Sequence, residues 1–299
     1  MTAREQHGKC SGSPQKTAAN PEQGPLLASI SADPFEEAFR LFTPERILHD
    51  PRATGKGVRV CVIDSGVEQS ILEQRQQRRG QQLLPIAGGV FASGALMPHP
   101  YTGRQSSPHG TTVADIILRL APSVQLFSAD VFGPHGHCQL EEIIRALHWA
   151  INVWHCKIVN LSLGVPEHQL QQVPRRYQFL RAVEEGYYKD VLIIAAAGND
   201  HPLTRSYPAM FAPPLISVDK RFFSDPLALA YELREQIEFQ ADGRGEYGPF
   251  AQEPATSWAV PHICGIAARI LSLRPNLKPF EMKTILYWLG QHYKRRGEG

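Results

Sequence analysis

Short runs of residues that are apolar at successive positions, separated by longer amphipathic segments, constrain the fold of this chain more than any other feature. A strand with one solvent-exposed face alternates apolar and polar residues, whereas a strand buried on both faces of a parallel sheet is apolar throughout. The runs with this second pattern are 58–64, 124–132, 157–163, 191–197 and 214–218, with a shorter one at 237–239. These runs predict a sheet of mainly parallel strands.

Segments with helical periodicity lie between these strands. In 140–151, apolar residues recur at positions i, i+3, i+4, i+7 and i+11, and a further helix is predicted to start near His109. Residues 257–272 are apolar on nearly every side, which predicts a buried central helix, and a last helix is predicted from Pro279 to Gly290. The predicted fold class is therefore α/β: a doubly wound, mainly parallel sheet with helices on both faces, in a single domain.

Four parts of the chain are distinguished by composition and periodicity. Residues 1–33 are polar and rich in Pro and Gly, which predicts a disordered N-terminal tail. A helix capped by Asp33 and a lead-in segment follow in 34–54, the alternating pattern occupies 55–290, and 291–299 form a basic C-terminal tail.

Two segments within the main domain interrupt the alternation. Residues 69–84 are rich in Gln and Arg, and we predict a surface insertion whose three arginines form a solvated face, because no aromatic residues are interleaved with them. Residues 223–236 are predicted to form a short helix and a loop.

The charge balance and the hydropathy exclude several classes of partner. The chain has 31 basic and 29 acidic residues, so its net charge does not indicate binding to nucleic acid or to an anionic membrane. Its longest apolar stretches are far shorter than the roughly 18 residues of a membrane-spanning helix.

The N-terminus lacks the basic and apolar regions of a secretory signal. The five cysteines form no CxxC pattern, which is typical of reduced thiols, and we expect a cytoplasmic protein.

Candidate functional residues stand at the predicted strand ends and helix starts, where ligands bind in open parallel sheets. They are Asp64 after the first strand, His109 before a helix, Asn199 after the fourth strand, and Ser257 at the start of the buried helix. Each has an ordinary structural explanation when taken alone, as a turn residue or a helix cap. Their order Asp, His, Asn, Ser, however, contains the Asp–His–Ser order of one kind of serine-protease triad.

The sequence resembles the subtilisin-like serine proteases, the subtilases, from about Gly55 to Gly290. GKGVRVCVIDSGVE resembles the Asp motif of that family, HGTTVADII its His motif, and ATSWAVPHICGIAA its Ser motif. FGPHGHCQLEEIIRALHWAI, IVNLSLG, VLIIAAAGND and SYPAMFAPP resemble the segments between these motifs, in the same order. The resemblance implies a serine endopeptidase for intracellular processing, with peptide or protein substrates. It implies a peptidase domain at 55–290; the oligomeric state is not indicated.

The resemblance also implies a role for each candidate residue. Ser257 is the expected nucleophile, His109 the general base, Asp64 the residue that orients His109, and Asn199 an oxyanion-hole donor. Further residues are expected to bind the substrate as an extended strand or to line the pocket for its primary side chain: Gly136, His137, Cys138, Ser162, Leu163, Gly164, Ala196, Ala197 and Gly198. No cofactor is required for this chemistry. No metal site is predicted, because His135, His137 and Cys138 lack a fourth ligand nearby in sequence and no loop has a run of acidic ligands for calcium.

The chain departs from the family pattern at several positions. Ala255 stands where the family usually has Gly, and a Cβ there is costly if the backbone needs a positive φ. Trp258 follows the nucleophile where a smaller Met is usual, and we expect it to crowd the oxyanion region. Asp115 and Cys138 also replace glycines. The alternative function is therefore a catalytically weakened pseudoprotease that binds peptides as a regulatory module. A nucleotide-binding domain is disfavoured, because no glycine-rich phosphate loop follows the first strand.

Overall fold

The computed structural model describes residues 33–92, 95, 97–133 and 136–297. These residues form two units, one that ends at Arg40 and one that begins at Leu41. The first unit contains all but the last residue of helix α1 (Pro34–Leu41), and the carbonyl of Asp33 accepts the backbone N–H of Glu37 at 3.0 Å. Apart from Asp33, the tail predicted for 1–33 lies outside the described residues.

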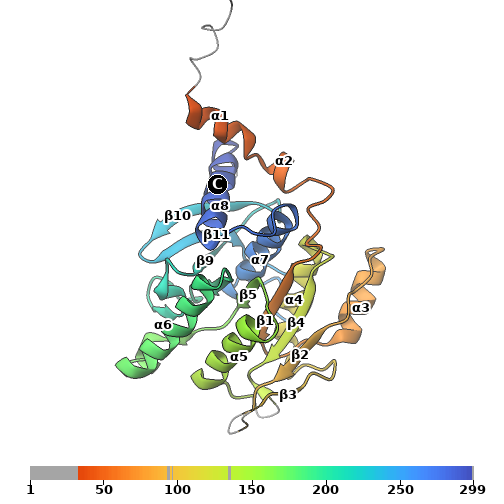
Figure 1. Ribbon diagram of the computed structural model, residues 1–299, viewed down its shortest axis with the longest axis vertical. Coiled ribbons are helices and arrows are strands. Elements are labelled where there is room, and N and C mark those ends of the chain that lie inside the picture. The colour runs from red at the N-terminus through yellow and green to blue at the C-terminus, as the bar shows by residue number, and fades with distance from the viewer. Residues whose placement is uncertain (1–32, 93–94, 96, 134–135, 298–299) are drawn as a thin grey trace, which may run out of the picture. The chain divides into compact units, whose positions relative to one another are not determined.

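A single large sheet organises the second unit (Figure 1). Nine strands of the described residues form it: β1 (Arg59–Asp64), β2 (Ala87–Val90), β3 (His99–Pro100), β4 (Gln125–Asp130), β5 (Ile158–Leu161), β7 (Leu192–Ala196), β9 (Ile216–Arg221), β10 (Leu229–Arg234) and β11 (Ile237–Asp242). Their order across the sheet is β10-β11-β9-β7-β5-β1-β4-β2-β3. The pairs from β11 to β2 are parallel, and β10 and β3 join the two edges antiparallel. Strands β6 (Val165–Pro166) and β8 (Ser206–Tyr207) form a separate antiparallel pair. Each predicted strand is present.

Helices cover both faces of this sheet, as the alternating sequence predicts. They are α2 (Pro44–Ile47), α3 (Gln69–Arg78), α4 (Pro108–Leu120), α5 (Leu140–Asn152), α6 (Val173–Tyr188), α7 (Thr256–Leu273) and α8 (Pro279–Arg295). Buried residues of α4, α7 and α8 pack in one core with Val60 and Val62 of β1. Buried residues of α5 and α6 pack in a second core with Cys61 and Ile63. Successive residues of β1 thus point into opposite cores, which confirms the doubly wound α/β class.

Three elements differ from the sequence-based expectation. The short helix and loop expected at 223–236 are instead a turn and β10, which pairs antiparallel with β11. Helix α8 does not end at Gly290 but continues to Arg295. Gly290 is needed there for close packing, because a Cβ at this position would lie 3.1 Å from the backbone nitrogen of Tyr231 in β10. Helix α6 was not anticipated, since only Phe179, Val183 and Gly186 of its residues are buried.

The parallel register brings the carboxyl ends of the central strands together. Asp64 at the end of β1 pairs with Asp130 at the end of β4, and β5 and β7 run parallel beside them. The segments that follow these strands therefore emerge at one edge of the sheet, where α4 and α7 also begin. All four candidate residues lie at this edge: Asp64 ends β1, Asn199 follows β7, and His109 and Ser257 are in the first turns of α4 and α7.

Candidate active site

Asp64 and His109 form a hydrogen-bonded pair at this edge. His109 lies in the first turn of α4, and its Nδ1 is 2.9 Å from both carboxylate oxygens of Asp64. The Asp64 side chain is 2% exposed and the His109 side chain 35% exposed, so the ring reaches from a buried carboxylate toward the solvent. Burial lowers the pKa of His109, but the charge of Asp64 and its hydrogen bond outweigh this effect and raise the pKa above its ordinary value.

Serine hydroxyls and one glycine hold this pair in place. Ser65 donates its backbone N–H to Asp64 Oδ1 at 2.7 Å, and its hydroxyl accepts the N–H of Gly110 at 3.1 Å. The first turn of α4 lies against the turn after β1, because a Cβ on Gly110 would be only 2.2 Å from the carbonyl oxygen of Gly66. A side chain at residue 110 would therefore push His109 away from Asp64.

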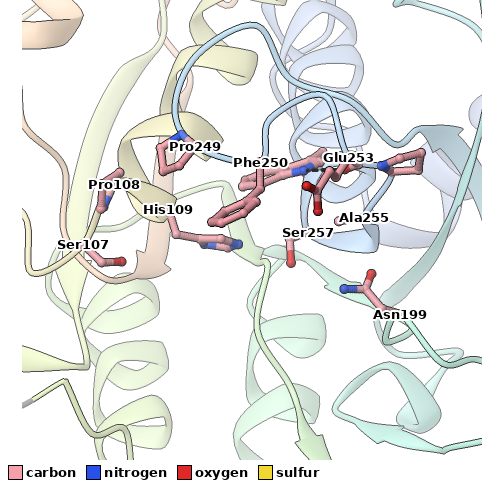
Figure 2. A pocket seen from close by; sticks show the side chains of 11 residues that line it. Ser107, Pro108, His109, Asn199, Pro249, Phe250, Glu253, Ala255 and Ser257 are labelled. Atoms are coloured by element: carbon pink, nitrogen blue, oxygen red, sulfur yellow. Dashed lines mark hydrogen bonds between the residues drawn. The ribbon is translucent and has the colours of Figure 1, made fainter.

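Ser257 is the second residue of α7, and it is linked to the segment after β5 by two hydrogen bonds. Its hydroxyl donates to the carbonyl oxygen of Ser162 at 3.1 Å, and the hydroxyl of Ser162 donates to the carbonyl oxygen of Ser257 at 2.8 Å. The Ser257 hydroxyl is therefore bonded to Ser162 rather than to His109. Ser257 and His109 nevertheless line the same cavity (Figure 2).

Asn199 follows β7 and lines the same cavity. Its Oδ1 accepts the backbone N–H of Thr256 at 2.9 Å, which fixes the amide plane. The amide nitrogen then points toward the Ser257 side chain (Figure 2). An N–H donor beside a hydroxyl at the N-terminus of a buried helix can stabilise negative charge that develops on a bound carbonyl oxygen.

The structure shows the conformations of Ala255 and Trp258, the two residues near Ser257 that differ from the family pattern. Ala255 has φ −139° and ψ 147°, an extended conformation that any residue adopts, so its Cβ causes no backbone strain. Trp258 does not crowd Asn199. Its ring lies against the ring of His109, with the centroids 4.7 Å apart at an angle of 35°, and its indole N–H donates to the carbonyl of Glu253 at 3.1 Å.

Two cavities flank Ser257 and Asn199. The first, of about 400 Å³, is lined by His109, Trp258 and residues of the 249–255 segment. The second, of about 220 Å³, is lined by several of the predicted substrate-binding residues: Ser162, Leu163, Gly164, Ala196 and Gly198. Ala197 does not line this second cavity, because successive residues of an extended segment point in opposite directions. Its side chain is instead buried in the core with α5 and α6. Gly136, His137 and Cys138 line neither cavity, and their substrate contact stays a prediction.

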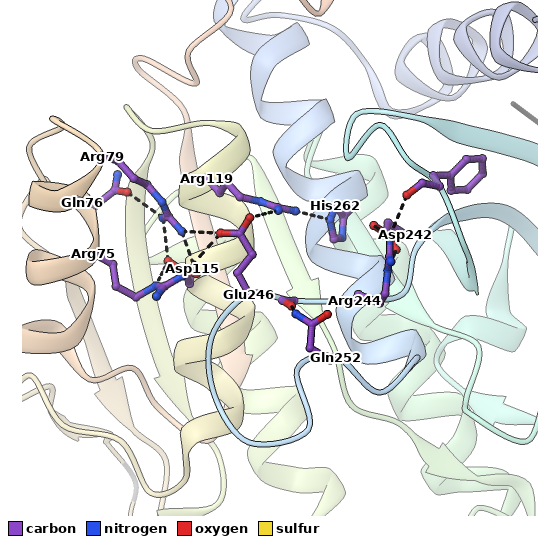
Figure 3. A network of polar contacts seen from close by, with 12 residues as sticks. Arg75, Gln76, Arg79, Asp115, Arg119, Asp242, Arg244, Glu246, Gln252 and His262 are labelled. Carbon is purple, nitrogen blue, oxygen red and sulfur yellow. Dashed lines mark hydrogen bonds and ion pairs between the residues drawn. The ribbon is translucent and has the colours of Figure 1, made fainter.

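Asp115 is the centre of an ion-pair cluster that the sequence did not predict (Figure 3). Its side chain is 2% exposed, and its Oδ1 lies 2.8 Å from Arg75 Nε and 2.8 Å from Arg79 Nη1. The expectation that the arginines of 69–84 form a solvated face is therefore wrong for Arg75 and Arg79, whose side chains are 19% and 21% exposed. Arg78 is exposed as expected.

This cluster continues to the helix that carries Ser257. Glu246 accepts from Arg79 at 3.4 Å and from Arg119 at 2.6 Å. Arg119 Nη2 lies 2.9 Å from Nε2 of the fully buried His262, and Nδ1 of His262 lies 2.8 Å from the carbonyl oxygen of Trp258. Burial lowers the pKa of His262 to about 4, so the ring is neutral, donating through Nδ1 and accepting through Nε2.

Few sequence signals could have found the remaining site residues. Phe250 and Glu253 belong to a Gly- and Pro-rich loop just before the Ser motif, and this place in the sequence is the signal that could have indicated them.

Among the described residues, no group of three or more His, Cys, Asp or Glu side chains could hold a metal ion. Within the same part of the chain, no helix has the length and apolar character needed to cross a membrane.

Comparison with known proteins identifies the class to which this fold and site belong. The model of the subtilase family matches residues 55–219, and the chain belongs to that family of serine-type endopeptidases. It is 28% identical to Subtilisin NAT from Bacillus subtilis subsp. natto over 291 residues, an alignment that covers 88% of this chain and 70% of that protein. It is 29% identical to a subtilisin from Bacillus pumilus over 251 residues, covering 77% of this chain and 82% of the relative.

Solved structures support the fold in the same way. The S41 psychrophilic protease matches with a TM-score of 0.61 at 23% identity, covering 81% of this chain and 87% of that structure. Sphericase matches with a TM-score of 0.60 at 24% identity, covering 80% and 86%. These likenesses establish the subtilisin-like fold and, at such identities, the fold alone.

Proposed function

We propose that this protein hydrolyses peptide bonds with Asp64, His109 and Ser257 as its catalytic triad. The observation that carries the proposal is that His109, paired with the buried Asp64, lines one cavity together with Ser257 and Asn199. His109 removes the proton of Ser257 as the hydroxyl attacks the substrate carbonyl, and later gives that proton to the leaving amine. Asp64 accepts a hydrogen bond from Nδ1–H of His109 and stabilises the imidazolium that exists between these two proton transfers.

Asn199 and the helix N-terminus complete the proposed mechanism. The Asn199 amide nitrogen and the Ser257 backbone N–H donate to the oxyanion of the tetrahedral intermediate. The dipole of the 18-residue helix α7 favours the same charge. Every step uses side chains and backbone groups of this chain, so we propose that no cofactor takes part.

The alternative, a pseudoprotease that binds peptides without turnover, depends on Ala255 and Trp258. Neither supports it, because Ala255 is in an extended conformation and Trp258 packs on His109 instead of over Asn199. The resting hydrogen bond from Ser257 to Ser162 does not argue for inactivity either, since catalytic hydrogen bonds are often incomplete before substrate binds.

A fluorophosphonate probe tests the proposal directly. The purified protein should be labelled at Ser257 and should cleave a diverse peptide library, and Ser257→Ala should abolish both. Ser224→Ala is the matched control, because Ser224 is an exposed serine outside the site. A wild-type protein that folds but is neither labelled nor active would refute the proposed function.

We also propose that the enzyme acts in the cytoplasm on peptides or proteins made there. The four cysteines in the described part of the chain are free thiols, and three of them are buried, which suits a reducing compartment. Cell fractionation with an antibody against the endogenous protein tests this proposal. Recovery of the protein mainly outside the cytoplasm would contradict it.

A further inference from the structure

The larger of the two cavities beside Ser257 has a chemical character of its own. Its volume is about 400 Å³, and Pro249, Phe250, Pro254 and Trp258 form apolar walls. Phe250 is 69% exposed and has φ +61°, a left-handed conformation that non-glycine residues rarely adopt. Its ring is held over the space beside His109 and Ser257 (Figure 2).

The proposed chemistry fixes which part of a substrate this cavity receives, so the following steps rest on the proposed function. His109 must protonate the leaving amine, and the residue that carries this amine must therefore lie beside His109. His109 lines the larger cavity and not the smaller one, whereas both cavities contain Ser257 and Asn199. The larger cavity thus accepts the side chain immediately after the scissile bond.

Glu253 gives this cavity a negative charge. It is an exposed lining residue, and Figure 2 shows its carboxylate directed toward Ser257 between Phe250 and Ala255. Its backbone is held at both ends: the N–H donates to the carbonyl of Phe250 at 2.9 Å, and the carbonyl accepts the indole N–H of Trp258 at 3.1 Å.

No described side chain neutralises this carboxylate. Among the described residues, no Lys, Arg or His forms an ion pair with Glu253, and the other lining residues carry no charge apart from the titratable His109. Lys220, the cation that contacts Asn199, donates to the Asn199 carbonyl at 2.9 Å and does not line the cavity. An open carboxylate beside an aromatic ring is a site for a cation on an aliphatic stem.

We propose that this cavity selects substrates with Arg or Lys immediately after the scissile bond. The Glu253 carboxylate pairs with the guanidinium or ammonium group, and the Phe250 ring covers the aliphatic stem. Because the carboxylate is exposed before substrate binds, the expected preference is modest, about threefold in kcat/KM. A purely apolar preference at this position is the competing outcome.

Quenched fluorescent peptides that differ only at the residue after the cleaved bond test the proposal. This residue is Arg, Lys, Leu, Glu or citrulline, which matches Arg in shape but is neutral. The wild type should cleave the Arg peptide about threefold faster than the citrulline peptide at low salt, and the Glu peptide slowest. Glu253→Gln should remove the difference between Arg and citrulline, and Glu253→Lys should favour the Glu peptide. Glu232→Gln, an exposed carboxylate that pairs with Arg234, is the control and should keep the wild-type ranking.

The outcomes separate this inference from the proposed function. Fluorophosphonate labelling of Glu253→Lys at Ser257 shows that its nucleophile is still reactive. If the wild type is labelled and cleaves the Leu or citrulline peptide as fast as the Arg peptide, the charge-selective cavity is refuted while the protease remains. A Glu253→Lys variant that still prefers Arg refutes the charge-selective cavity in the same way. A wild type that is neither labelled nor active overturns both proposals.

Discussion

Replacing Trp258 by Leu removes the aromatic face against which the His109 ring lies. The two ring centroids are 4.7 Å apart, within the range where an aromatic face attracts a cation. The attraction acts on the imidazolium and not on the neutral imidazole, so it favours the protonated form. Leu keeps the site apolar and covered, and the substitution therefore tests the aromatic face more than the exclusion of water.

The size of the effect follows from the exposure of His109. Cation–aromatic contacts contribute about 0.5–1 kcal/mol when exposed and about 2 kcal/mol when desolvated. The His109 side chain is 35% exposed, which places the contact near the middle, at about 1 kcal/mol. At 1.36 kcal/mol for each pH unit, Trp258→Leu should lower the pKa of His109 by about 0.7. The acidic limb of the kcat/KM profile then moves to lower pH, because the neutral base persists further into acid.

The pH dependence of kcat/KM and an NMR titration of the His109 ring measure this pKa independently. His109→Ala identifies the NMR signal among the 12 histidines. Trp258→Phe keeps an aromatic face and should lower the pKa by less than Trp258→Leu. A higher pKa in Trp258→Leu would refute this reasoning, since it would show that lost burial outweighs the lost aromatic contact.

Three further predictions concern stability and turnover. Asp115→Ala leaves Arg75 and Arg79 without their buried partner and should lower the free energy of unfolding, measured by urea denaturation, by about 3 kcal/mol. Glu246→Gln, at a half-exposed carboxylate, should lower it by less than about 1 kcal/mol, and equal effects of the two substitutions would contradict this ranking. Asn199→Ala should lower kcat by about 10²–10³ with little change in KM, a magnitude typical of subtilisin-class oxyanion holes rather than one derived from this chain, and an unchanged kcat would exclude Asn199 from that role. His262 is buried with a pKa of about 4, below its value in the unfolded chain. Its contribution to the free energy of unfolding, on the order of 3 kcal/mol, is therefore complete above about pH 6.5 and is lost as the pH falls toward 4. His262→Asn should flatten that pH dependence, and a profile as steep as the wild type would show that another group causes it.

The parts of the fold that could be predicted are those in which local sequence and tertiary burial agree. β1, β5 and β7 are buried on both faces, so their continuous apolar runs located them within one or two residues. β10 was missed because its sequence, LAYELR, is rich in helix formers and only its first two residues are buried. Pairing with β11 at the edge of the sheet overrides that propensity.

The candidate site shows the same division. Asp64, His109, Asn199 and Ser257 could be selected because each stands at the end of a strand or the start of a helix, and parallel strands end at one edge. The ion pairs of Asp115 with Arg75 and Arg79 could not be predicted, because Asp115 lies in α4 whereas Arg75 and Arg79 lie in and just after α3, and their spacing carries no periodic signal. The conformation of Ala255 was equally out of reach, since a residue's φ depends on its neighbours in space.

The hydrogen bond from Ser257 to the Ser162 carbonyl would make the reactivity of this proposed nucleophile depend on the substrate backbone. A peptide that adds as a strand beside Ser162–Gly164 would compete with the serine hydroxyl for this same acceptor. A backbone N–H that takes the Ser162 carbonyl would free the hydroxyl to turn toward His109. Without that competition the Ser257 hydroxyl would stay bonded to Ser162, and we expect a small electrophile that cannot form a strand to react more slowly than a peptide does.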